Sequence, residues 1–343
     1  MLFGTRVPLA AAPMAGGGTT PALVAAVTRA GGFGFLAAGY KTPEALAAEM
    51  TTLSEAGVAF GANLFVPDRN QVDRSQVDRT AFTEYAARLE PEAAAVGVSL
   101  AGLSAAGPVA DDDHWAAKLA LLQARPVPWV SFTFGLPSAA DAAALRSAGS
   151  RLLATVTTRA EADQAVTLGV DGLIAQGSAA GGHSATFDAQ REIIDGDVVD
   201  LVRALVPLGL PIVAAGGVDG PETVRRILAA GAEAVAVGTL LLRTDEAGTA
   251  ATHRAALADP RFRTTTITHA FTGRPARGLA NGFIARHESA APYGYPAIHH
   301  LTRDLRAAAA RAGDADRVHL WAGTGWRSAR TGPAAETIAW LQP

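Results

Sequence analysis

A single histidine, His183, follows two glycines in the stretch "IAQGSAAGGHSATF", residues 174–187. The stretch begins as an apolar run that ends at Gln176, and a loop of Gly, Ser and Ala follows it. Glycine loses more backbone entropy on folding than any other residue, so Gly181 and Gly182 indicate a close approach to the backbone. A neutral imidazole with an ordinary pKa of about 6.5 is suited to act as a general base. The alternative is a loop histidine, or one that caps a helix, without a chemical role.

The sequence lacks the residue patterns of several other kinds of site. It contains no cysteine, which excludes disulfides, thiolate metal ligands and cysteine nucleophiles. No HExxH motif or clustered ligand spacing predicts a zinc site, and no GxSxG elbow indicates a Ser/His/Asp hydrolase. His299 and His300 are adjacent, so their side chains are not expected to point at one site. We therefore expect no metal.

Eight short apolar runs alternate with Ala-rich helical stretches along the chain. The runs are apolar on both faces, which is typical of parallel strands covered by helices. Eight such strand–helix units most simply close into an α/β fold of the TIM (β/α)8 barrel type. An open doubly wound sheet is the alternative, although no GxGxxG fingerprint follows the first run. The predicted strands cover residues 7–14, 33–39, 59–66, 129–135, 151–156, 170–177, 211–218 and 232–242.

The last part of the chain lies beyond the eighth unit. It contains a Pro/Tyr-rich stretch at 291–300, a helical pattern at 301–313 and a last helix near 333–341. We therefore predict a barrel over residues 1–261 and a smaller cap subdomain with C-terminal helices over 262–343.

Composition narrows the possible partners of the protein. Of its 343 residues 49% are hydrophobic and 18% charged, and the formal net charge of −3 does not suggest a nucleic-acid footprint. The N-terminal apolar patch is broken by Pro13 and glycines, has no basic start and does not suggest a signal peptide; no apolar stretch is long enough to span a bilayer. The default expectation is a cytoplasmic protein without nucleic-acid or membrane partners, whose oligomeric state the sequence does not predict.

The carboxyl ends of the predicted strands carry the candidate site, because barrel enzymes place their sites on the loops there. Glycines after the seventh and eighth strands would bring backbone N–H groups and helix N-termini close to an anion, or would only close tight turns. Asn63 and Gln176 either tie down a neighbouring loop or face the hydrogen-bonding edge of a heterocyclic ring. The strand-end residues are Pro13, Met14, Ala15, Gly16, Asn63, Phe65, Gln176, Gly181, Gly182, His183, Gly216, Gly217, Gly238 and Thr239.

Several motifs, taken in order, resemble the nitronate monooxygenases, formerly called 2-nitropropane dioxygenases, and especially their class I. They are "PLAAAPMAGG", "GANLFVP", "QGSAAGGH", "THAFTGRPAR", "PIVAAGGV", "AVGTLLL" and the tail "LTRDLRAAAARAG…LWAGTG", so the resemblance covers almost the whole chain. It implies a TIM barrel that binds FMN noncovalently, with His183 as catalytic base or anion stabiliser. It also implies flavin contacts from Asn63, Gln176, Gly181, Gly217, Gly238 and Thr239, to which we add their strand-end neighbours Met14, Gly182 and Gly216.

The loop that contains His183 departs from that family. The family usually has Glu-Ala-Gly-Gly-His followed by Arg-Gly, whereas this chain has Ala179 in place of the acid and Ser184-Ala185 after the histidine. The missing acid and base indicate either the loss of an ion pair or recognition of a different substrate. His299 stands where many relatives have Asn.

The resemblance implies an FMN-dependent oxidoreductase. The expected reaction is oxidation of an alkyl nitronate, such as propionate 3-nitronate, by O2 to a carbonyl compound and nitrite, and Tyr293 and Tyr295 either line the site or pack the subdomain. The alternatives are an NAD(P)H-dependent flavin reductase similar to the enoyl-thioester reductases, a divergent flavin barrel that acts on another substrate, and a barrel that has lost its chemistry.

Overall fold

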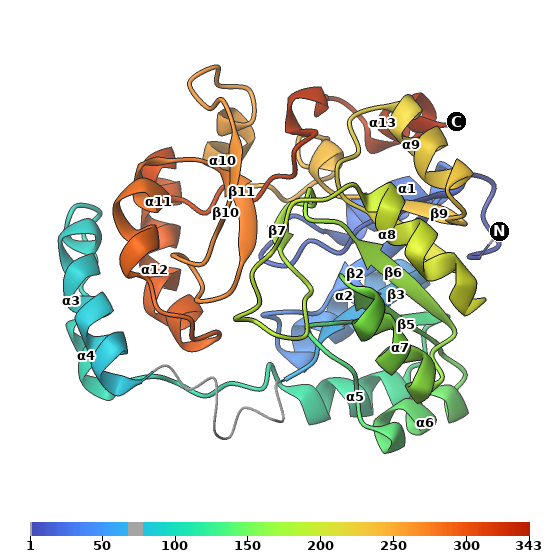
Figure 1. Cartoon of the computed structure of the whole chain (residues 1–343), viewed down its shortest axis with the longest axis horizontal. Helices are drawn as coiled ribbons and strands as arrows, with labels where there is room; N and C mark the ends of the chain where they lie inside the picture. Colours follow the sequence, from blue (N-terminus) through green and yellow to red (C-terminus); the bar gives the residue numbers. More distant parts are fainter. Residues whose placement is uncertain (1, 68–77) are drawn as a thin grey trace.

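The eight apolar runs form a closed barrel of parallel strands in a computed structural model that describes residues 2–67 and 78–343 (Figure 1). The first strand pairs with both the second and the last barrel strand, which closes the sheet and confirms the TIM barrel over the open sheet. The barrel strands, in their order around it, are β1 (Leu9–Ala11), β2 (Phe33–Ala37), β3 (Phe60–Phe65), β4 (Trp129–Thr133), β5 (Arg151–Val156), β6 (Gly172–Gln176), β8 (Ile212–Ala215) and β9 (Ala234–Val237).

Helices begin where the sequence supplies a cap. Thr20 Oγ1 accepts a hydrogen bond from the N–H of Leu23 at 3.0 Å, and Pro21 occupies the first turn, where its missing N–H costs nothing. The same Thr-Pro arrangement starts the second helix at Thr42. The helices that follow strands around the barrel are α1 (Pro21–Arg29), α2 (Pro43–Glu55), α5 (Trp115–Ala124), α6 (Ala139–Ser147), α7 (Arg159–Leu168), α8 (Val198–Leu205) and α9 (Pro221–Ala229).

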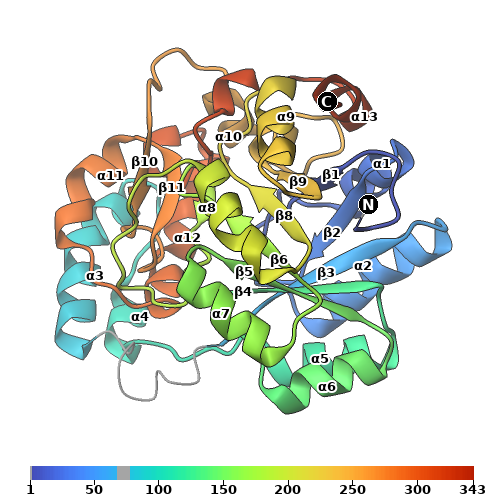
Figure 2. The ribbon, with the colours of Figure 1, turned by 45° about the vertical axis from the view of Figure 1, so that its right-hand side comes forward.

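The C-terminal helix takes the place beside α1 that the helix after β9 would occupy. Only a 3₁₀ turn (Thr239–Leu241) and the short α10 (Ala251–Ala256) follow β9. Helix α13 (Ala334–Leu341) packs against both α1 and α9, and its Ile338 and Leu341 belong to the barrel core (Figure 2). The chain therefore completes its outer ring of helices with its last residues.

A second core joins two segments that are distant in sequence. It is formed by α3 (Arg79–Ala94), α4 (Ala101–Ala106), α11 (Gly282–His287) and α12 (Ala297–Arg311), which lie together on one side of the barrel in Figures 1 and 2. Its buried side chains include Phe82, Tyr85, Leu89, Phe271, Phe283, Leu301 and Leu305. The division at residue 261 stays a prediction. Residues 79–106 pack with the tail, whereas α13 packs with the barrel.

A small antiparallel sheet, which the sequence analysis does not predict, connects the tail to the barrel. It has the order β10 (Thr265–Thr268), β11 (Ala276–Leu279) and β7 (Gly182–His183), so a two-residue strand of the loop after β6 pairs with the tail. Within residues 2–67 and 78–343, no helix is long and apolar enough to cross a membrane.

A cluster of charges fastens α3 to the tail. Glu92 is 7% exposed and accepts hydrogen bonds from Arg286 Nε at 2.6 Å and from His287 Nε2 at 2.9 Å. Arg317 Nε lies 2.7 Å from its other carboxylate oxygen. Burial opposes the charge on Glu92, but the hydrogen bonds from Arg286 and His287 and the nearby positive charges outweigh it and lower the pKa to about 2.

Replacing Glu92 by Gln is expected to lower the free energy of unfolding by about 3 kcal/mol. This is the lower end of the range for breaking a buried ion pair, because Arg286 is partly exposed. Urea unfolding of Glu92→Gln measures the loss, and Glu84→Gln, the same change at an exposed position of α3, serves as the control. Equal stability of the two variants would contradict the assigned role.

Candidate active site

The carboxyl ends of the barrel strands open into a cavity of about 520 Å³, closed on its other side by α12 and the segment around Trp321. Every residue predicted for the site lines this one cavity, as the strand-end argument expects. The residues that it brings together are Met14, Asn63, Gln176, Gly181, Gly182, His183, Gly216, Gly217, Gly238 and Thr239. Their individual roles stay predictions.

The backbone of His183 is fixed from both sides. On one side it pairs with Ala276 of β11. On the other, Gln176 Nε2 donates a hydrogen bond to the carbonyl of His183 at 3.1 Å, and Gln176 Oε1 accepts one from the N–H of Ala185 at 2.7 Å. The imidazole therefore projects from a braced segment, although that segment is a loop between two barrel strands.

Thr272 sets the tautomer of the imidazole. His183 Nε2 lies 2.9 Å from Thr272 Oγ1, and that hydroxyl donates its own proton to the carbonyl of Arg274 at 3.2 Å. Because a hydroxyl has one proton, Thr272 accepts from Nε2–H, and the lone pair of the neutral ring lies on Nδ1. The free nitrogen is the one that could accept a proton.

The surroundings of His183 disfavour its protonated form. The imidazole lies deep in the protein, and the accessible part of its surface faces the cavity. The rings of Phe134 and Tyr295 lie 5.6 Å from it, centroid to centroid. Burial, followed by the positive charges of Arg274 and Arg306, lowers the pKa of His183 to about 3, so the imidazole is neutral at physiological pH.

The two positions before His183 require glycine for different physical reasons. A Cβ on Gly181 would stand 2.5 Å from the backbone nitrogen of Gly323, so the predicted close approach at Gly181 is confirmed, and its partner is the chain itself. Gly182 has a φ of +77°, which side chains rarely adopt. Both glycines are therefore needed to fold the loop, whatever else approaches it.

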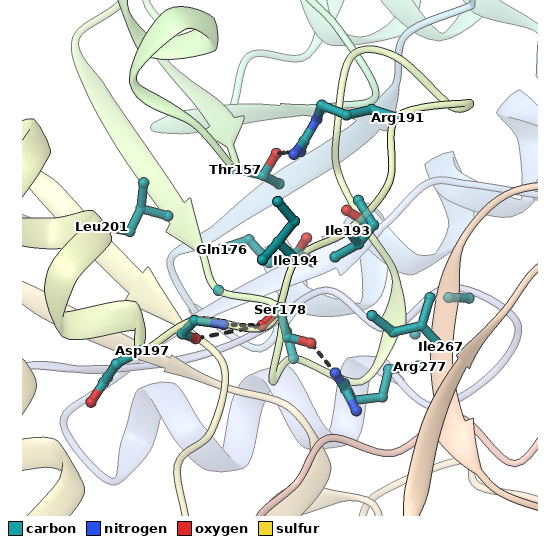
Figure 3. Close-up of a pocket in the computed structure, with 16 residues that line it drawn as sticks. Thr157, Gln176, Ser178, Arg191, Ile193, Ile194, Asp197, Leu201, Ile267 and Arg277 are labelled. Carbon is teal, nitrogen blue, oxygen red and sulfur yellow. Dashed lines mark hydrogen bonds between the residues drawn. The ribbon is translucent and has the colours of Figure 1, made fainter.

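Hydrogen bonds from other segments fix the backbone of the loop around Ala179. They do not depend on the acid and the base of the family pattern, which this loop lacks. Figure 3 shows the small pocket behind the loop, where Arg277 Nε donates to the carbonyl of Ser178 at 2.7 Å. The guanidinium of Arg277 also pairs with Asp195 at 2.6 Å. Ser178 Oγ accepts from the N–H of Gly196 at 3.0 Å. The loop thus has ties of its own to the tail and to the segment before α8.

The two strand-end amides are both engaged by the protein. Asn63 Nδ2 donates to Ser131 Oγ and to Thr133 Oγ1, each at 3.0 Å, which links β3 to β4. Gln176 uses both of its polar atoms on the loop that contains His183. These contacts are those of the structural alternative, and a role toward a heterocyclic ring stays a prediction for both residues.

The ends of β8 and β9 offer backbone donors without acceptors. Gly216 and Gly217 have φ values of +111° and +74°, and in the described part of the chain their N–H groups and that of Gly238 have no hydrogen-bond acceptor. A Cβ on Gly216 would stand 2.9 Å from the nitrogen of Ala180. Unpaired backbone N–H groups that line a cavity fit an anion such as a phosphate.

The cavity contains further polar residues that sequence reasoning missed as site residues. Tyr40 lies three residues after the last residue of β2, so the strand-end rule would have found it if applied to every strand. Arg306, on α12, and His319 gave no signal, because they come from the tail, to which no rule assigns a site. His299, considered in the sequence only beside His300 and as a departure from the family pattern, also lines the cavity.

The tail aromatics and histidines divide between the cavity and the surface. Tyr295 contacts His183, whereas Tyr293 is 39% exposed and stacks on His269. His300 points away from the cavity and hydrogen bonds to Asp111 at 2.9 Å. The two adjacent histidines therefore have different surroundings, as expected.

Comparison with known proteins gives consistent matches over the whole length. The family model described as nitronate monooxygenase matches residues 2–343. A protein named "Probable nitronate monooxygenase" from Staphylococcus aureus (strain Newman) is 32% identical over 341 residues, which are 97% of this chain and 92% of the relative. A protein of the same name from Staphylococcus saprophyticus is 33% identical over 329 residues, with coverages of 94% and 90%.

Solved structures agree with these matches. The structure of nitroalkane oxidase from Streptomyces ansochromogenes is similar with a TM-score of 0.89 and 42% identity, covering 98% of this chain and 95% of that one. FabK from Thermotoga maritima has a TM-score of 0.71 and 22% identity, with coverages of 99% and 93%, and supports the fold alone.

Replacing His183 by Asn is expected to flatten the pH dependence of stability. Below about pH 6.5 the unfolded chain protonates this histidine while the folded protein does not, so acidification from pH 7 toward pH 4 destabilises the parent protein. Each such histidine contributes a slope of about 1.4 kcal/mol per pH unit, which the variant lacks.

Denaturant unfolding at a series of pH values measures this slope. His253→Asn is the positive control, because burial lowers the pKa of His253 to about 4. Parallel stability profiles of the parent and His183→Asn would show that the imidazole is not held neutral.

Proposed function

Because the chain belongs to the nitronate monooxygenase family and is thus an oxidoreductase, we propose that it uses FMN and O2 to oxidise alkyl nitronates to a carbonyl compound and nitrite. The observation that carries the proposal is a neutral His183 with Nδ1 free, placed in a cavity among aromatic rings. A reaction that begins with removal of a proton from an acidic C–H requires such a group.

The cavity residues fit FMN. The family is flavin-dependent in general, and the unpaired N–H groups of Gly216, Gly217 and Gly238 suit the phosphate of the mononucleotide. Met14, Asn63 and the other predicted flavin contacts line the same cavity. When bound, FMN would supply the electron transfer between substrate and O2.

The protein's own residues accept the α-proton of the substrate and stabilise the negative charge of the nitronate. With a neutral nitroalkane, Nδ1 of His183 accepts the α-proton while Thr272 holds the opposite nitrogen. With a preformed nitronate no proton has to move, and the positive charge of Arg306, which lines the cavity, favours the anion. The rings of Phe134 and Tyr295 exclude water from the imidazole.

The decisive experiment is an absorption spectrum of the purified protein, followed by anaerobic titration with propionate 3-nitronate. We expect a flavin spectrum that bleaches on addition of the nitronate and returns with O2, with nitrite formed. Rapid reduction by NAD(P)H with none by the nitronate would overturn the proposal and favour a flavin reductase. A protein without a chromophore that does not bind added FMN would overturn it in favour of a barrel that has lost its chemistry.

His183→Asn is expected to separate the two substrate forms. Loss of the base should slow anaerobic flavin reduction by neutral nitroethane by about 10²- to 10⁴-fold, the usual contribution of general-base catalysis. Reduction by preformed ethyl nitronate should change much less. Stopped-flow absorbance measures both, and undiminished reduction by nitroethane would exclude His183 as the base.

Thr272→Val is expected to slow the reduction by nitroethane about tenfold or more, because the imidazole loses the partner that fixes its tautomer. Thr272→Ser keeps the hydroxyl and should restore most of the rate. If Ser and Val give the same rate in stopped-flow measurements, packing rather than the hydrogen bond explains the effect.

A further inference from the structure

His269 is not part of the described lining of the cavity, and both nitrogens of its ring have an acceptor. Its Nδ1 lies 2.7 Å from Oε1 of Glu288, and its Nε2 lies 2.8 Å from the carbonyl oxygen of Ala291. A neutral imidazole carries one N–H and satisfies only one of two acceptors, whereas the protonated ring donates to both. The side chain is 16% exposed, so water does not readily replace either acceptor. The surroundings of His269 therefore favour the imidazolium.

The charge of Glu288 acts in the same direction. Burial opposes protonation of His269, but the hydrogen bonds to Glu288 and Ala291 and the negative charge of Glu288 outweigh it and raise the pKa of the imidazole. The same pairing lowers the pKa of Glu288. Tyr293 covers one face of the ring, with centroids 4.3 Å apart and planes 3° apart. The titratable and charged groups that face His269, directly or beyond Glu288 and Tyr293, are Glu288, Tyr293, Tyr85, Arg88 and Glu192.

The backbone of His269 begins the turn that joins β10 to β11. Its carbonyl accepts hydrogen bonds from the N–H groups of Gly273 and Thr272, at 2.7 and 3.3 Å. Its own N–H donates to the carboxylate of Glu288 at 3.2 Å, and the hydroxyl of Thr268 donates to the same group. Glu288 thus binds the end of β10 as well as the main chain and the ring of His269.

His269 joins the two segments that deliver partners to His183. One segment is this turn, whose Thr272 Oγ1 lies 2.9 Å from Nε2 of His183. The other begins at Ala291 and carries Tyr295, whose ring centroid lies 5.6 Å from that of His183. The hydrogen bond between Nε2 of His269 and the carbonyl of Ala291 therefore ties together two walls of the base.

We propose that His269 is a positioning residue, which together with Glu288 holds Thr272 against His183 while its ring is protonated and releases it when the ring is neutral. Loss of the proton leaves one N–H for two acceptors and removes the ion pair, so the turn loses one of its ties. His269 itself takes no part in proton transfer with the substrate. The effect on the reaction rests on the proposed function, whereas the effect on the tautomer of His183 does not.

The direction of the pH dependence follows from the pKa of His269. Because that pKa is raised on folding, the contacts of the protonated ring are complete below the ordinary histidine pKa of about 6.5 and are lost as the pH rises through the higher value in the folded protein. His183 does not titrate in this range, since its pKa is about 3. A loss of His183 function on the alkaline side is therefore expected from His269.

The first test follows anaerobic flavin reduction by nitroethane against pH, with the nitroethane kept unionised in acid until stopped-flow mixing. In the parent holoenzyme we expect the rate to fall at alkaline pH. Glu288→Gln keeps an acceptor for the ring but not the charge, and it should move this fall to lower pH by about one unit or more. Reduction by preformed ethyl nitronate, which needs no base, should change less than about threefold over the same range.

Substitution of His269 separates its two hydrogen bonds. His269→Asn places an amide donor near the position of Nδ1, and His269→Gln places one near Nε2, so each variant keeps one bond and neither can titrate. Both should lower the rate with nitroethane about tenfold and remove its alkaline fall. Asp111→Asn is the matched control, because it removes the same charge beside His300, which points away from the cavity, and it should change neither result.

A spectroscopic measurement makes the inference independent of turnover. The chain has eight histidines, so ¹⁵N-histidine labelling of the holoprotein allows the tautomer of His183 to be read from its ring nitrogen shifts. Below the histidine pKa of about 6.5 we expect one tautomer, protonated at Nε2. At alkaline pH, and in His269→Asn at every pH, we expect a mixture of tautomers. If the tautomer responds in this way but nitronates do not reduce the flavin, the proposed function fails and the role of His269 stands.

Three results would overturn the inference. One is a parent profile for nitroethane whose alkaline fall is absent, or stays at the same pH in Glu288→Gln. Another is an equal loss of rate with nitroethane and with the nitronate in both His269 variants, which would indicate a structural role. The third is a His183 tautomer that is the same in the parent and in His269→Asn. If the His269 variants do not fold, Glu288→Gln and the titration of the parent decide.

Discussion

The pairing of β7 with β11 is the contact on which the candidate site depends. Two residues of a barrel loop, Gly182 and His183, join Arg277 and Ala276 of the tail in an antiparallel ladder. A two-residue strand has no independent stability, so it needs β11 and the side chain of Gln176 on either side of it. The imidazole is therefore positioned jointly by the barrel and by a segment about ninety residues further along the chain.

The same arrangement explains how the loop keeps its shape without the acid and base that the family resemblance leads us to expect there. Arg277, which belongs to β11, reaches the carbonyl of Ser178 and pairs with Asp195. The strand that braces His183 thus also supplies the cation that fixes the preceding turn. An ion pair within the loop is unnecessary in this chain, so Ala179 and Ser184 do not by themselves indicate a different substrate.

The barrel and the location of the site could be predicted from sequence, because apolar runs and strand-end residues are local signals. The tail could not, since β11 is recognisable only through its partners and α3 packs there through long-range contacts. Gln176 shows a second limit. Its type and place indicated a polar role, but only the fold shows that both of its polar atoms serve the loop rather than being free for a ligand.

The distribution of charged side chains affects both His183 and the ligands that the cavity can bind. Carboxylates lie on the surface, as at Asp200 and Glu222, and at the buried Glu92, while the described lining of the cavity has none. The cationic groups near His183 lower its pKa and so preserve a neutral base, and they also favour anionic ligands. A carboxylate placed beside His183 would raise its pKa and repel a nitronate. The absence of acids along the described lining therefore has two effects. It keeps the pKa of His183 low, and it avoids repulsion of anionic ligands.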